Sequence, residues 1–478
     1  MAESSSKGLF DESSFLFGTA SASYQVEGAW NANGKGENIW DRLVHTKPET
    51  VVDKDTGDVA CDSYHKYKED VQLIKYIGFD FYRFSISWSR VLPTGEDNVI
   101  NQDGISYYNN LINELLENGI QPLVTLYHWD LPQPLQDLGG WLNPLMAEYF
   151  ECYARVIFSH FGDRVKWWIT INEPSEIISG YSNAGYAPYL DLHGTGDYLA
   201  AHTLIRAHAK AYHLYDKEFR KSQNGKVSIT INSMWNEPLT PTSRDKDACE
   251  RAMQFELGLF GHPIYSKKGD YPEIVREVVD KNSADEKRSR SRLPSFTSEE
   301  IKEIRGTFDF FGLNHYTSRY VTPGLEGPIP SLIRDSGVIK SCDPNWPTAK
   351  SSWLKVVPWG FRKLLQWIKE EYDNPPVLIT ENGFSSSKAP NDTDRISYHF
   401  DYLTEMSLAI KEDQCNVIGY TVWSILDNFE WMRGYSERFG LYYVDFTNQD
   451  RPRIPKQSVE FFKSLCQTRT IPTIKDSK

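Results

Sequence analysis

The segment Pro-Val-Leu-Ile-Thr-Glu-Asn-Gly-Phe at residues 376–384 is an apolar run that stops at a carboxylate, an amide and a glycine. The run is too short for a helix, and its Val and Ile residues favour a parallel strand that is buried on both faces. The segment Val-Lys-Trp-Trp-Ile-Thr-Ile-Asn-Glu-Pro at residues 165–174 repeats the pattern. A single glutamate at a strand end is most simply a solvated loop residue. Two of them in the same context, Glu173 and Glu381, indicate one shared site.

Eight segments have the length and composition of buried strands, and they lie at residues 15–18, 79–88, 122–127, 165–171, 226–231, 308–313, 376–380 and 417–423. Apolar residues at spacings of three and four predict helices between them, at residues 64–74, 105–116, 146–161, 199–219 and 361–368. Eight strands alternating with helices best fit an α/β fold of the closed (β/α)8-barrel type. A doubly wound open sheet is the alternative, but it usually begins with a glycine-rich phosphate loop. The turn Gly-Thr-Ala-Ser at residues 18–21 has too few glycines for that.

The 478 residues correspond to about three average domains, but α/β barrels with insertions can exceed about 400 residues as one unit. We therefore interpret residues 1–478 as a single barrel domain. Residues 23–28 are predicted to form a polar turn, and the charged residues 281–294 a loop. Residues 317–352 are rich in Pro, Gly and Ser and follow a strand end, so we expect a long loop that covers the catalytic face.

The composition restricts the kinds of partner. The net charge of −13 disfavours nucleic acid and anionic membranes as partners, and no long uncharged apolar run suggests a membrane span. The six cysteines are scattered without the close pairs that hold zinc, so we interpret them as mostly free or structural. Residues 1–7 lack the apolar core of a signal peptide, which predicts either a cytosolic chain or one recorded after processing.

Polar and aromatic side chains stand at the predicted strand ends, which meet on one face of a barrel. Amides, an imidazole, carboxylates and indoles suit a sugar, because its hydroxyls need hydrogen bonds and its C–H face needs an aromatic surface. No phosphate loop or metal-ligand cluster is present in the sequence. The strand-end set comprises Gln25, Arg83, His128-Trp129, Asn172-Glu173, Asn314-His315-Tyr316, Glu381-Asn382, Trp423 and Glu430-Trp431.

Hydrolysis of a glycosidic bond requires two carboxyl groups on either side of the anomeric carbon, and a separation of about 5 Å leads to retention through a glycosyl-enzyme ester. One carboxyl must carry a proton for the leaving oxygen, and the other must be ionised to attack carbon. Arg83 would keep Glu381 ionised if its guanidinium pointed at that carboxylate.

Several motifs together resemble those of family 1 glycoside hydrolases. Thr-Ile-Asn-Glu-Pro at 170–174 and Ile-Thr-Glu-Asn-Gly at 379–383 are similar to the acid/base and nucleophile signatures of that family. The resemblance extends from residues 17–20 and 24–28 to 428–431 and 435–440, which is nearly the whole chain. It is closest in character to insect members, among them β-glucosidases and myrosinases.

The resemblance implies a role for each matching residue. Glu173 matches the acid/base and Glu381 the nucleophile. The residues that match those around the sugar are Gln25, His128, Asn172, Trp423, Glu430, Trp431 and Phe439, with Trp353 at the leaving-group site. The residues that match those supporting the nucleophile are Arg83, Asn314 and Tyr316.

The resemblance also implies an activity: a retaining β-glucosidase that releases terminal non-reducing β-D-glucosyl residues from cellobiose, short cello-oligosaccharides and aryl or alkyl β-glucosides, as in cellulose degradation. It implies no cofactor and no metal, a monomer or homodimer, and no nucleic-acid or membrane partner. We expect a secreted digestive enzyme whose signal peptide is absent from this chain, with a cytoplasmic location as the alternative.

Other interpretations remain open. His128, Trp423 or Trp431 alone would more often be core residues, and Arg83 could be a structural cation. Glu173 differs from the glutamine of plant myrosinases, and Glu430 argues against phospho-glycosidases. A thioglucosidase acting on plant glucosides is one alternative, because only the leaving group differs. A non-catalytic sugar-binding barrel is the other, although both glutamates are present.

Overall fold

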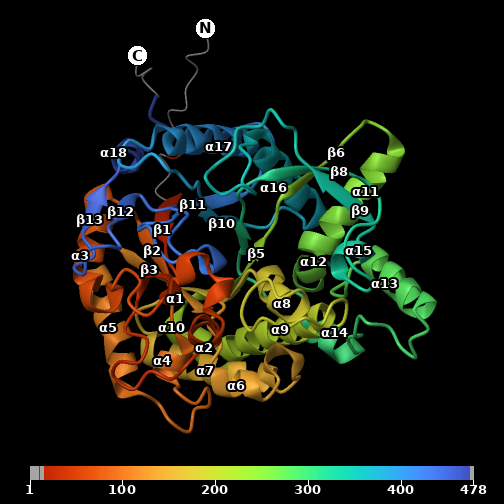
Figure 1. Ribbon diagram of the computed structural model, residues 1–478, viewed down its shortest axis with the longest axis horizontal. Coiled ribbons are helices and arrows are strands. Elements are labelled where there is room, and N and C mark those ends of the chain that lie inside the picture. Colours follow the sequence, from red (N-terminus) through yellow and green to blue (C-terminus); the bar gives the residue numbers. More distant parts are fainter. Residues whose placement is uncertain (1–9, 11–14, 474–478) are drawn as a thin grey trace.

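Eight parallel strands form a closed barrel at the centre of the molecule (Figure 1). The computed structural model describes residue 10 and residues 15–473. The barrel order β1-β2-β3-β4-β5-β7-β10-β11 follows the chain, which confirms the (β/α)8 prediction. The strands are β1 (Leu16–Ala20), β2 (Phe81–Ser85), β3 (Gln121–Tyr127), β4 (Trp167–Asn172), β5 (Lys226–Asn232), β7 (Phe311–Asn314), β10 (Val377–Asn382) and β11 (Val417–Trp423).

Helices surround the strands in Figure 1. In α5 the predicted stripe is buried at Ile105, Tyr108, Leu111, Ile112 and Leu115, whereas its last member, Leu116, is half-buried. The helix before β2 ends at Gly78, as expected, because its φ of 89° favours glycine. The longer helices are α3 (Ser63–Ile77), α5 (Gln102–Glu117), α7 (Met146–Phe161), α9 (Gly196–Leu214), α13 (Glu273–Asp285), α16 (Pro358–Glu371), α17 (Thr393–Lys411) and α18 (Ser458–Thr468).

An apolar cluster fills part of the barrel interior. Phe81, Leu123, Ile169, Phe310 and Leu378 form one buried group. Because β2 and β10 are not neighbours in the barrel, their side chains can share a cluster only by meeting inside it. The polar side chains at the carboxyl ends of the strands are therefore backed by a packed core.

The excursions from the barrel carry more structure than predicted. Residues 317–352 contain two strands, β8 (Ser318–Pro323) and β9 (Val338–Ser341), and the short helix α15 (Leu332–Asp335) between them. The two strands form a three-stranded sheet with β6 (Trp235–Pro238). Backbone pairing with β6, which cannot be read from local composition, makes this segment ordered. The expected loop at 281–294 is helical as far as Asp285, because it continues α13, whose buried face consists of Val275, Val279 and Ser283.

Two local predictions near the site also need correction. Residues 23–26 form the short helix α1 (Ser23–Val26) rather than a turn, and its four side chains are buried. Strand β2 ends at Ser85, and Trp88 begins the short helix α4 (Trp88–Val91). The apolar run at 79–88 thus continues as core beyond the strand. No helix in the described part of the chain is long and apolar enough to cross a membrane.

Candidate active site

Ten of the thirteen predicted site residues line one cavity of about 660 Å³ at the carboxyl ends of the barrel strands. Gln25, Arg83 and Asn172 are fully buried and support the residues that line it. The ten that line the cavity are His128, Glu173, Asn314, Tyr316, Trp353, Glu381, Trp423, Glu430, Trp431 and Phe439. Segments more than 300 residues apart in the chain thus meet around one space, because the ends of parallel strands converge.

Glu381 is held by two donors at the end of β10. Arg83 donates from Nη1 to Oε1 over 2.7 Å, and the hydroxyl of Tyr316 donates to Oε2 over 2.7 Å. Arg83 is fully buried on β2, so its charge needs a partner, and this ion pair supplies one. The expected direction of Arg83 is therefore present in the structure.

Glu173 lies where β4 passes into α8 (Pro174–Ser182), with a left-handed φ of 48°. Its Oε1 accepts a hydrogen bond of 2.6 Å from Nδ2 of Asn314, at the end of β7. A positive φ is uncommon for glutamate, and residues with strained backbone angles cluster at functional sites. Its backbone N–H donates to the carbonyl of Thr230, which fixes the residue to the neighbouring strand.

The surroundings of the two carboxyls differ in charge. Burial, together with the negative charges of Glu381 and Glu176, raises the pKa of Glu173 well above its usual value. Burial also raises the pKa of Glu381, but Arg83 and the Tyr316 hydroxyl act in the opposite direction. A single shared proton therefore resides on Glu173 and leaves Glu381 as the anion.

The hydrogen-bond directions in the sugar-facing wall follow from Arg83. Because a guanidinium only donates, Oδ1 of Asn172 must face Arg83, and Nδ2 of Asn172 must donate to Nε2 of His128 over 3.1 Å. Burial and the nearby positive charge of Arg83 lower the pKa of His128 well below its usual value, so the ring is neutral. Its proton then sits on Nδ1, a buried atom without a partner among the described residues. His128 thus presents a donor.

Gln25 complements His128 with an acceptor. Its Nε2 donates to the carbonyl of Phe429 over 2.8 Å and to Oδ1 of Asn428 over 3.0 Å. Its Oε1 is buried and has no partner within the described residues. Nε2 also approaches Oε2 of Glu430 at 3.4 Å, so these two extended side chains stand side by side. Unpaired buried polar atoms are costly, which is why an acceptor and a donor left free here indicate a polar ligand.

Aromatic rings complete the inner wall. The ring of His128 lies 5.9 Å from Trp423 and 5.9 Å from Trp431, in both cases nearly parallel. Trp129, which the sequence placed in the strand-end set without a role of its own, lies 4.6 Å from Trp431 and donates from its indole to the carbonyl of Asn172. Its position directly after His128 was the signal available for it.

Trp353 and Phe439 flank Tyr316. Trp353 meets the tyrosine edge-on at 5.8 Å and is 42 % exposed, whereas Phe439 meets it at 6.1 Å and is buried. Trp353 comes directly after the long segment 317–352, and it lines the cavity. Trp353 therefore lies on the exposed side of the cavity and Phe439 on its enclosed side.

The outer half of the cavity contains residues that the sequence did not single out. Asn232 ends β5 in the same strand-end pattern, and its Nδ2 donates to Oε1 of Glu176 over 2.8 Å. Lys340 of β9 forms an ion pair with Glu256 of η5 (Gln254–Gly258). Although burial opposes it, Lys340 keeps the pKa of Glu256 below its usual value. No local signal joins these two residues, which are 84 positions apart.

The described residues contain no group of three or more His, Cys, Asp or Glu side chains arranged to hold a metal ion. All six cysteines are free thiols, in line with the prediction that most are free or structural. The carboxyl groups of Glu173 and Glu381 can perform acid–base and nucleophilic chemistry in this cavity.

Comparison with known proteins identifies relatives along almost the whole chain. The profile of glycosyl hydrolase family 1 matches residues 7–471. Myrosinase 1 of Brevicoryne brassicae is 55 % identical over 456 residues, which cover 95 % of this chain and 98 % of that protein. Cytosolic beta-glucosidase of Homo sapiens is 47 % identical, covering 94 % and 97 %. The solved structure of aphid myrosinase superimposes with a TM-score of 0.92 at 54 % identity, covering 95 % of this chain and 98 % of that one.

Glu430 generates a prediction about stability. Burial and the negative charges of Glu437 and Glu381 raise the pKa of Glu430 to about 8, from an ordinary value of 4.5. The pKa of this carboxyl is higher in the folded state than in the unfolded state, so its ionisation destabilises the fold. The destabilisation is absent below pH 4.5 and complete above about pH 8. The side chain of Glu430→Gln is neutral at every pH. The free energy of unfolding of this variant, relative to that of the wild type, should therefore increase by about 1–3 kcal/mol as the pH rises through this window.

Thermal midpoints of Glu430→Gln and wild type, measured between pH 4.5 and 8.5 at a fixed scan rate, check this expectation. Glu326→Gln is the control, because Glu326 is an exposed carboxyl that lines the same cavity. A difference between Glu430→Gln and wild type that stays constant across this range would contradict the assignment.

Proposed function

Because the chain belongs to glycosyl hydrolase family 1, we propose that it is a retaining β-glucosidase with Glu173 as acid/base and Glu381 as nucleophile. The observation that carries the proposal is the difference in charge between the neighbours of the two carboxyl groups. Glu381 faces a buried arginine and a phenol, whereas Glu173 faces an amide and two carboxyl groups. This difference supplies a nucleophile and a proton donor in one cavity.

In the first step an oxygen of Glu381 attacks the anomeric carbon, and the bond from that carbon to the leaving oxygen breaks. Glu173 gives its proton to the leaving oxygen, so the aglycone departs as a neutral alcohol. The products of this step are a glucosyl ester on Glu381 and an ionised Glu173. Arg83 and Tyr316 hold the attacking carboxylate in place before the ester forms.

In the second step Glu173 removes a proton from water, and the resulting oxygen attacks the anomeric carbon on the face that the aglycone left. The ester bond breaks, glucose of the β configuration is released, and Glu381 recovers its negative charge. Loss of the Glu381 charge in the ester lowers the pKa of Glu173, because that charge was one cause of its elevation. Glu173 can thus be an acid in one step and a base in the next.

The inner wall supports recognition of a β-D-glucosyl unit. His128 offers a donor and Gln25 an acceptor, and Glu430 lies beside Gln25 for a hydroxyl that needs two partners. Trp423 and Trp431 provide the aromatic surface, and Phe439 encloses it. A volume of about 660 Å³ lies within the range of about 300–1,000 Å³ typical of ligand sites and leaves room for an aglycone. Cellobiose, short cello-oligosaccharides and aryl or alkyl β-glucosides are the proposed substrates.

A thioglucosidase is the second candidate, and it is favoured by the 55 % identity to Myrosinase 1. The charge of the outer cavity weighs against it, since natural thioglucosides of the glucosinolate class carry a sulfate. Lys340 is the only lysine or arginine among the described residues that line the cavity, and Glu256 already pairs with it. Glu176, Asp197 and Glu326 add acidic groups. An anionic aglycone would therefore be repelled more than a neutral one.

We also propose a cellular location and an oligomeric state for the protein. We retain a secreted digestive enzyme as the first choice and a cytoplasmic one as the alternative, and the name of the human relative supports the alternative. A monomer or a homodimer is proposed.

A substrate panel tests the proposed activity. Among p-nitrophenyl β-D-glycosides the glucoside should have the highest kcat/KM, ahead of the galactoside and the fucoside, and cellobiose should be cleaved. A glucosinolate should fall at least about tenfold below an uncharged aryl glucoside, because like charges meet in the outer cavity. A glucosinolate that exceeds the aryl glucoside would overturn the O-glucosidase proposal in favour of the thioglucosidase.

Glu381→Gln tests the nucleophile. The amide has the same shape but cannot form the ester, so we expect no measurable turnover of p-nitrophenyl β-D-glucoside. The matched control is Glu326→Gln, a change of an exposed carboxyl that lines the same cavity, and this variant should keep most of its kcat. Turnover by Glu381→Gln within about two powers of ten of the wild type would refute the role, since even a general acid or base contributes that much.

Glu173→Gln tests the acid/base. A poor leaving group needs the proton and an activated aryl group does not, so cellobiose should lose about 10²–10⁴-fold in kcat while a dinitrophenyl glucoside loses far less in its first step. Added azide should restore turnover of the activated substrate and give β-glucosyl azide, identified by NMR. Equal losses on both substrates, with no azide product, would contradict the role of Glu173.

A further inference from the structure

The far end of the cavity is formed by an excursion between β8 and β9. We call residues 324–337 the roof segment; it contains the short helix α15. Ser331, Leu332, Ile333 and Ser336 of this segment line the same cavity as the two catalytic glutamates. A ligand that extends far enough from the glutamates along this cavity therefore meets the roof segment.

Helix α15 cannot hold its own position. It has four residues, and a helix of one turn is unstable without tertiary contacts. Ser331 caps it, because the Ser331 hydroxyl accepts a hydrogen bond from the backbone N–H of Arg334 over 3.1 Å. The place of α15 in the molecule must come from contacts with other elements.

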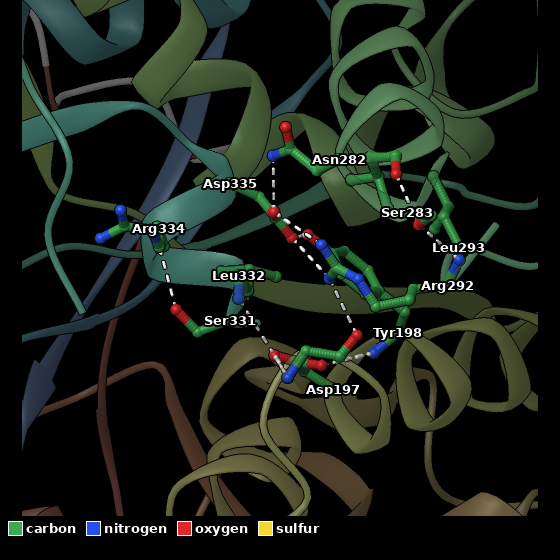
Figure 2. A network of polar contacts seen from close by, with 12 residues as sticks. Asp197, Tyr198, Asn282, Ser283, Arg292, Leu293, Ser331, Leu332, Arg334 and Asp335 are labelled. Atoms are coloured by element: carbon green, nitrogen blue, oxygen red, sulfur yellow. Dashed lines mark hydrogen bonds and ion pairs between the residues drawn. The ribbon is translucent and has the colours of Figure 1, made fainter. Parts of the chain in front are cut away.

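Asp335, the last residue of α15, supplies those contacts (Figure 2). Its carboxylate is buried and accepts two hydrogen bonds from Arg292, of 2.7 and 2.8 Å. It also accepts one of 2.7 Å from the Tyr198 hydroxyl and one of 2.8 Å from Nδ2 of Asn282. These donors come from α9, from α13 and from the segment after α13. A charge with four donors in a buried place fixes the backbone that carries it.

Arg292 is anchored in turn. Its Nη1 also donates to the carbonyl of Gly194 over 2.9 Å, and its other nitrogens pair with Glu286. Asp197 accepts a hydrogen bond from the backbone N–H of Leu332 over 3.3 Å, which adds a second tie to α15. In Figure 2 these side chains form one continuous network between α15 and the helices beside it.

None of Asp335, Arg292, Tyr198 and Asn282 is among the described residues that line the cavity. Their effect on a ligand must pass through Leu332 and Ile333, which do line it. Phe255, Leu259 and Val338 line the cavity together with those two side chains, among polar lining residues such as Glu326, Ser331 and Ser336. We call this part of the cavity the chamber; α15 carries two of its five apolar side chains.

We propose that Asp335 and Arg292 are positioning residues that set the end wall of this chamber and thereby determine how well the enzyme uses glucosides with long apolar aglycones. The inference rests on the proposed β-glucosidase function. It assigns no contact with substrate to either residue. Loss of the Asp335 charge releases α15, so Leu332 and Ile333 no longer pack against the end of a long aglycone, while a short aglycone does not reach them.

The test compares methyl, butyl and octyl β-D-glucosides by kcat/KM in wild type and Asp335→Asn. The ratio of kcat/KM between octyl and methyl glucoside does not depend on the folded fraction, so a variant that folds poorly still gives a valid result. In the wild type kcat/KM should rise with chain length. In Asp335→Asn the octyl-to-methyl ratio should fall by about tenfold, the effect of losing an apolar contact or two. Asn282→Ala, which leaves Arg292 paired, should lower the ratio less.

Asp70→Asn provides the matched control. Asp70 of α3 pairs with Arg453 of β13 (Arg453–Pro455) at 2.9 Å in an equally buried ion pair, and neither residue lines the cavity. This variant should lose stability without changing the ratio. An unchanged ratio in Asp335→Asn, or an equal fall in Asp70→Asn, would overturn the proposal. A wild type that hydrolyses all three glucosides without dependence on chain length would overturn it as well, whereas inactivity on every glucoside would refute the proposed function.

Discussion

The ion pair between Arg83 and Glu381 is the interaction on which the rest of the site depends. It joins β2 to β10, strands that are not neighbours, and so it crosses the interior of the barrel. A buried guanidinium without a carboxylate would be strongly destabilising, so this partner fixes Glu381 as an anion. The same guanidinium sets the orientation of Asn172, and through it the tautomer of His128. One cation thus determines both the charge of the proposed nucleophile and the direction of a hydrogen bond offered to the sugar.

The asymmetry between the two carboxyls follows from this arrangement. Burial acts on Glu173 and Glu381 alike, and only their neighbours differ. With Arg83 committed to Glu381, the negative charge of Glu381 becomes one of the causes that keep Glu173 protonated. Acid and nucleophile are therefore not two independent assignments, because the charge that defines one helps to define the other.

The parts that the sequence predicted share a physical basis. Buried parallel strands have a characteristic length and composition, so all eight were recognisable, and the direction of the strands then placed their polar ends together. The parts it missed depend on pairing at long range. Glu256 and Lys340 meet only because β9 joins β8 and β6, and residues 317–352 looked like a loop for the same reason. Asp335 and Arg292 belong to two segments that had been predicted as loops, which gave no reason to join them.

This division bears on how far a relative's activity can be transferred. The proposed chemistry resides at the carboxyl ends of the barrel strands, whose register and direction leave the two carboxyls, Arg83 and Asn314 little freedom. The chamber for the aglycone is built from excursions such as the roof segment, whose position depends on a few side-chain contacts far from the reacting atoms. Small changes in those contacts can alter the accepted leaving group without disturbing catalysis. High identity to a myrosinase is therefore strong support for the reaction type and weak support for the aglycone, which must be argued from the charge and apolar lining of this chain's own chamber.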